Sequence, residues 1–141
     1  MSKSKLEDLK RPPSITILGL IFIIIGIFAF TGSFFLWGEG VILNPPADVD
    51  LEFPITDILI NAPASLIAGI GLFRLNKWGK YMTWFVSGFY IYASVEIFVQ
   101  LWQEERFPPE IAIPQVLAII VAIVGMRQTI KYEHLLIRDN F

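Results

Sequence analysis

The sequence of 141 residues contains no cysteine, and only 17% of its residues are charged. Without cysteine the protein can form no disulfide, no thiol nucleophile and no thiolate metal site. The net charge of -2 offers no basic surface for a nucleic-acid partner. Hydrophobic residues make up 55% of the chain, which excludes intrinsic disorder, because disorder requires low hydrophobicity. These absences leave a hydrophobic protein without thiol chemistry and without affinity for nucleic acid.

The hydrophobic residues are concentrated in four long runs. A bilayer core about 30 Å thick requires about 20 predominantly apolar residues in a helix. Four segments meet this requirement, namely residues 15–37, 54–75, 80–102 and 111–130. Helices satisfy their own backbone hydrogen bonds in lipid. The sequence therefore predicts an all-α integral membrane protein, with residues 1–141 forming a single antiparallel bundle of four transmembrane helices.

Nearly all basic residues fall on one side of this four-span arrangement. Ten of the 11 Lys and Arg residues lie in the N-terminal tail, between the second and third spans, or at the C-terminal end. Only Arg106 falls on the other side, where the connecting segments are acidic. Cytoplasmic segments of membrane proteins are enriched in Lys and Arg. We therefore expect a protein of the plasma (inner) membrane with both termini in the cytoplasm.

Small residues recur at helical spacing within the runs. Helices in lipid associate through close packing, so small residues mark the faces that contact other helices. Residues of this kind occur in all four runs: Gly19, Gly26, Ala29, Ser33, Ala64, Ser65, Ala68, Gly69, Gly71, Thr83, Ser87, Ser94, Ala118, Ala122 and Gly125. We interpret them as helix contacts.

Five polar residues are expected at similar depth in the outer half of the bundle: Asp57, Asn61, Glu96, Gln100 and Gln115. Glu96 is the clearest ionisable residue inside a run, and such residues are candidate functional groups. Asp57 and Asn61, one turn apart, are expected to bracket it in depth. The cluster has a functional interpretation, either a cation or proton site or the mouth of a pathway. It also has a structural interpretation, in which hydrogen bonds tie helices together or dock a partner subunit.

A proline inside the second run and the single histidine are two further notable residues. Pro63 lies one turn further into the second run and is expected to kink it. His134, the single histidine, lies beyond the fourth run, where it is not expected to bind a metal. We expect no metal site and no cofactor.

The segment Gly69–Lys80, with the sequence GIGLFRLNKWGK, joins a run rich in small residues to a basic link that contains Trp78. It resembles a turn in small, uncharacterised prokaryotic four-span membrane proteins. This resemblance implies a prokaryotic inner-membrane protein and implies no activity.

Catalytic constellations are missing from the sequence, since it shows no Ser-His-Asp set, no metal cluster and no phosphate-binding loop. We therefore do not expect an enzyme. The leading prediction is an accessory or scaffold subunit, surrounded by lipid, that packs against other membrane subunits or against copies of itself. The alternative is a small transporter or channel for an ion, proton or solute, using Glu96 with Asp57 and Asn61. A lipid-binding role is the third possibility.

Overall fold

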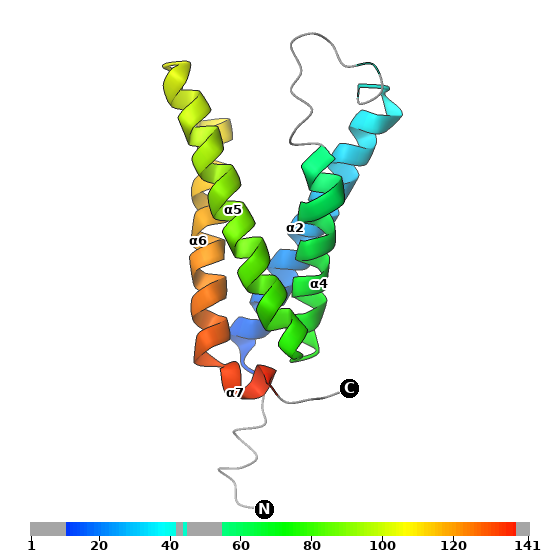
Figure 1. Ribbon diagram of the computed structural model, residues 1–141, viewed down its shortest axis with the longest axis vertical. Coiled ribbons are helices and arrows are strands. Elements are labelled where there is room, and N and C mark those ends of the chain that lie inside the picture. The colour runs from blue at the N-terminus through cyan, green and yellow to red at the C-terminus, as the bar shows by residue number, and fades with distance from the viewer. Residues whose placement is uncertain (1–10, 42–43, 45–54, 138–141) are drawn as a thin grey trace, which may run out of the picture.

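The computed structural model describes residues 11–41, 44 and 55–137, and every regular element in these ranges is helical (Figure 1). The elements are α2 (Pro13–Gly38), the short π-helix η1 (Asp57–Asn61), α4 (Ala62–Phe73), α5 (Lys77–Gln103), α6 (Pro109–Lys131) and α7 (Glu133–Leu136).

Three of these helices are long and apolar enough to cross a membrane: α2 with 26 residues, α5 with 27 and α6 with 23. At about 1.5 Å per residue, each exceeds the bilayer core of about 30 Å. A fourth apolar helical segment, Asp57–Phe73, is shorter. The predicted first residue of this span, residue 54, and the acidic segment before it lie outside the described residues. The prediction of an all-helical membrane protein is confirmed.

The helices form two pairs, α2 with α4 and α5 with α6, which diverge like the arms of a V (Figure 1). The pairs meet near α7 and the link between α4 and α5, which we call the convergent end. They separate toward the opposite end, which we call the open end. The two arms are joined chiefly where α4 packs against α5.

The link between α4 and α5 is tight because two glycines lie against each other. A Cβ added at Gly71 would lie 2.4 Å from Cα of Gly79, so neither position can carry a side chain without moving the backbone. Leu75 in the link adopts a positive φ of 50°. Asn76 then caps α5, since its side chain accepts a hydrogen bond from the backbone N–H of Trp78 at 2.8 Å.

The small residues of the other helices also lie at contacts. A Cβ at Gly19 would lie 3.1 Å from the carbonyl oxygen of Gly69, which brings α2 directly against α4. A Cβ at Gly125 would lie 3.2 Å from Thr83, where α6 crosses α5. Ala29 and Ala118 are only partly buried, whereas the other small residues of the predicted set are buried. The interpretation of these residues as helix contacts is confirmed.

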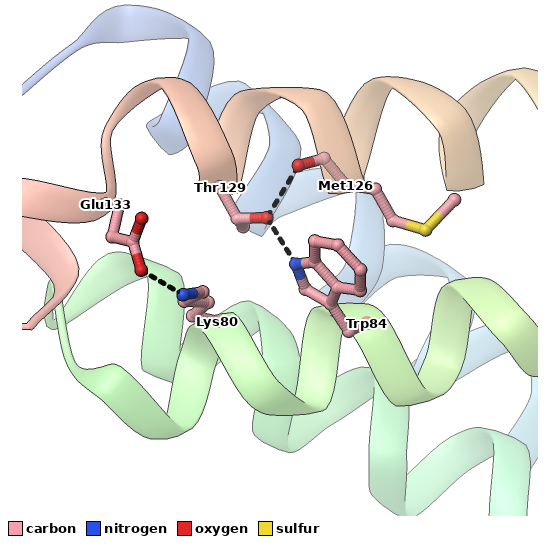
Figure 2. Close-up of polar contacts among 5 residues, drawn as sticks. All are labelled: Lys80, Trp84, Met126, Thr129 and Glu133. Carbon is pink, nitrogen blue, oxygen red and sulfur yellow. Dashed lines mark hydrogen bonds and ion pairs between the residues drawn. The ribbon is translucent and has the colours of Figure 1, made fainter.

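Polar contacts add to the packing at the convergent end (Figure 2). Lys80 on α5 forms an ion pair with Glu133 on α7. One turn along, the indole N–H of Trp84 donates to Thr129 Oγ1 at 3.0 Å, and Thr129 donates to the carbonyl of Met126 at 2.9 Å. These contacts join α5 to the end of α6 and to α7.

Candidate functional site

A cavity of about 690 Å³ lies between the two helix pairs. We call it the inter-pair cavity. Its walls come from α2, η1, α5 and α6 and are mostly apolar, with the side chains Ile25, Phe28, Phe89, Ile97, Leu117 and Val121 among them.

Five polar residues also line the inter-pair cavity: Asp57, Asn61, Tyr90, Ser94 and Gln115. They come from three elements, because Asp57 and Asn61 belong to η1, Tyr90 and Ser94 to α5, and Gln115 to α6. An apolar pocket with a few convergent polar groups is the usual form of a ligand site.

A directed chain of hydrogen bonds links three of these cavity-lining residues, Tyr90, Asn61 and Asp57, through Ser65 on α4. The Tyr90 hydroxyl lies 2.7 Å from Ser65 Oγ, which donates to Asn61 Oδ1 at 3.0 Å. Because the Ser65 hydroxyl has one proton and gives it to Asn61, Tyr90 must be the donor to Ser65. Asn61 Nδ2 in turn donates to Asp57 Oδ1 at 2.8 Å. Every donor in the chain therefore points toward the Asp57 carboxylate.

The π-helical turn η1 sets the position of Asp57 and Asn61. It closes with a bond from the backbone N–H of Ala62 to the carbonyl of Asp57, five residues back. Pro63 follows at the start of α4. Proline has no N–H, and its ring crowds the carbonyl four residues earlier, which here belongs to Leu59. The wider π turn relieves this crowding. The disturbance expected at Pro63 thus takes the form of a π turn on its N-terminal side.

A second polar contact crosses from α5 to α6 at the cavity wall. Ser94 Oγ lies 3.2 Å from Gln115 Oε1 and 3.3 Å from the backbone carbonyl of Gln115. Ser94 is buried and Gln115 is half-buried. This contact holds the two helices of one arm together beside the cavity.

The structure brings three of the five predicted cluster residues to one cavity, namely Asp57, Asn61 and Gln115. Glu96 and Gln100 are half-buried on α5, but neither lines the cavity. The reason is angular: Glu96 is two positions after Ser94, so it lies about 200° around the helix from Ser94 at about 100° per residue. Glu96 is grouped with the other residues of the predicted cluster only because of its expected depth in the membrane.

Two members of the hydrogen-bond chain, Ser65 and Tyr90, are absent from the predicted cluster. Ser65 lies four residues after Asn61, so helical spacing could have identified it. Tyr90 reaches the chain from another helix, and no spacing in the sequence predicts that contact.

The described part of the chain holds no group of three or more His, Asp or Glu side chains that could bind a metal ion. No protein-family model, curated protein or solved structure matches the chain. What the protein does must therefore be inferred from the inter-pair cavity and its polar residues.

Proposed function

We propose that the protein is a non-catalytic accessory protein of a prokaryotic inner membrane, in which the inter-pair cavity holds another component of that membrane. The observation that carries this proposal is the cavity itself, bounded by both helix pairs, apolar in its walls and fitted with a directed hydrogen-bond chain. Buried polar groups in a membrane helix bundle are costly unless they serve packing or binding.

In this proposal the chain is one domain of four antiparallel spans, with the segment that contains α4 as the second. The basic residues Arg74, Lys77, Lys80, Arg127 and Lys131 belong to the convergent end. The enrichment of Lys and Arg in cytoplasmic segments assigns this end and both termini to the cytoplasm. The open end and Asp57 then belong to the outer half of the membrane.

The cavity is accessible from the side of the bundle. Phe28 on α2 is 73% exposed and Leu117 on α6 is 56% exposed, although both line the cavity. Residues that line a cavity and are also exposed form its rim. A component dissolved in the membrane can therefore enter between α2 and α6 without crossing the bilayer.

Site-specific photo-crosslinking in native membranes tests this proposal. A photo-reactive residue at Leu117 faces the cavity, and one at Ile120, three residues along α6 and 50% exposed, serves as the matched control because it does not line the cavity. We expect Leu117 to capture a defined lipid or protein, identified by mass spectrometry, that Ile120 does not. Identical capture of bulk lipid at both positions would contradict the proposal.

Transport is the second candidate, because the hydrogen-bond chain leads from Asp57 inward to Tyr90, which is only 5% exposed. Since Glu96 does not line the cavity, such a pathway would use Asp57. Ion flux into proteoliposomes that is lost in Asp57→Asn but kept in Glu96→Gln would replace the accessory role with transport. Absence of flux in the wild type would remove this candidate.

A further inference from the structure

The size of the inter-pair cavity decides which class of membrane component it can hold. Small-molecule sites enclose about 300–1,000 Å³, and this cavity encloses about 690 Å³. A helix turn about 10 Å wide and 5.4 Å high takes up about 420 Å³, so the cavity holds fewer than two turns. A spanning helix of about 20 residues has more than about five turns. The volume of the cavity matches a single amphiphilic molecule better than it matches a spanning helix.

The charge of the cavity-lining side chains indicates which polar group the bound amphiphilic molecule carries. Asp57 is the acidic residue among the cavity-lining side chains, and Asn61 occupies one of its oxygens. An ionised carboxylate offers about four acceptor positions, so Asp57 can accept further hydrogen bonds from a ligand. Because Asn61 Oδ1 accepts a hydrogen bond from Ser65, the N–H group of Asn61 points to Asp57, and the Asp57 carboxylate is the acceptor. A cationic group with N–H donors complements this arrangement.

Depth along the helices gives the orientation of the ligand. Asp57 lies 16 residues from the end of α4, roughly 24 Å at 1.5 Å per residue. Val121, at the apolar inner part of the cavity, lies ten residues from Lys131, roughly 15 Å. The polar group is therefore near the outer surface and the apolar walls extend toward the bilayer centre. This is the orientation of a lipid in the outer leaflet.

Resting on the proposed function, we infer that the inter-pair cavity binds an outer-leaflet lipid with a primary ammonium headgroup. The ammonium donates to the Asp57 carboxylate, and one hydrocarbon chain lies between Phe28, Phe89 and Val121.

Native mass spectrometry of the purified full-length protein tests this inference. The protein is titrated with lipids of identical chains that carry ethanolamine, choline or glycerol headgroups. The wild type should bind the ethanolamine lipid about tenfold or more tightly than the glycerol lipid, because one charge-assisted hydrogen bond corresponds to about that factor. The choline lipid should bind less tightly than the ethanolamine lipid, since choline is cationic but has no N–H donor.

Three variants test where the headgroup preference arises. Asp57→Asn should bring the three affinities to within about twofold of each other by removing the charge-assisted bond. Glu96→Gln makes the same acid-to-amide change outside the cavity and should keep the wild-type preference. Ala93→Phe, which places a large ring in the cavity, should reduce binding of the ethanolamine lipid. Circular dichroism checks that each variant is folded.

The outcomes separate the two proposals. Equal binding of all headgroups by the wild type, or a preference that survives Asp57→Asn, would overturn the lipid assignment. Capture of a protein by the crosslinker at Leu117 would also overturn it, while leaving the accessory role supported. Failure of the accessory role itself would appear as identical capture at Leu117 and Ile120.

Discussion

Two fully buried serines on neighbouring helices have opposite surroundings. Ser65 on α4 hydrogen-bonds to both Asn61 and Tyr90. Ser87 on α5 has no hydrogen-bond partner for its Oγ within the described residues, and a Cβ at Gly125 would lie 3.4 Å from that atom. A buried hydroxyl stabilises a protein only when its hydrogen bonds are made. The two residues therefore differ in energetic role although both are small, polar and buried.

Replacing each serine by alanine measures this difference. We expect Ser65→Ala to lower the free energy of unfolding by about 1 kcal/mol, because it removes the hydrogen bonds that Ser65 makes to the Tyr90 hydroxyl and to Asn61 Oδ1. Ser87→Ala should be neutral or slightly stabilising, because it removes a polar atom that makes no hydrogen bond. Reversible unfolding in mixed micelles, with the wild type alongside, gives both values. An equal loss in the two variants would mean that volume alone matters at these positions.

The α4–α5 hairpin is the element on which the V depends, since it joins the two arms. Its two helices approach closely because both Gly71 and Gly79 lack a side chain. Gly88 lies further along α5, where a Cβ would meet nothing within 4 Å. The same substitution on one helix can thus be tested at a crowded and at an open position.

Alanine at these two glycines should give opposite results. Gly79→Ala should destabilise the protein by about 3 kcal/mol, because its Cβ would lie 2.3 Å from the backbone carbon of Gly71 and force the helices apart. Gly88→Ala should stabilise it by up to about 1 kcal/mol through helix propensity. Thermal unfolding in detergent measures both. A stable Gly79→Ala protein would show that the hairpin tolerates a wider separation.

At the scale of the whole molecule, the absence of cysteine makes topology directly measurable. Glu104, after α5, and His134, on α7, are both exposed and lie at opposite ends of the helices. With both termini in the cytoplasm, a membrane-impermeant maleimide should label Glu104→Cys in intact cells and His134→Cys only after lysis. The reverse labelling pattern would show the opposite orientation. Labelling of both residues in intact cells would contradict the prediction that the membrane separates them.

Much of the fold could be predicted from the sequence, because uninterrupted apolar runs define the helices. The predicted segments 15–37, 80–102 and 111–130 begin and end within three residues of α2, α5 and α6. The small residues at the helix contacts were predictable for the same reason, since their spacing follows one helix face.

The candidate site could be predicted only in part. Asp57 and Asn61 share one helix and one turn, so their contact follows from spacing. The contact between Ser65 and Tyr90 depends on how α4 is rotated against α5. Glu96 matched the others in depth but not in angle. Contacts within a helix are encoded locally, whereas contacts between helices depend on packing that a single sequence pattern does not specify.

The divergence of the two helix pairs has a mechanical consequence for the surrounding bilayer. A wedge displaces more lipid area in the leaflet at its broad edge than in the leaflet at its narrow edge. That asymmetry creates a spontaneous curvature, so a bilayer bent convex toward the broad edge accommodates the protein with less elastic strain than a flat one.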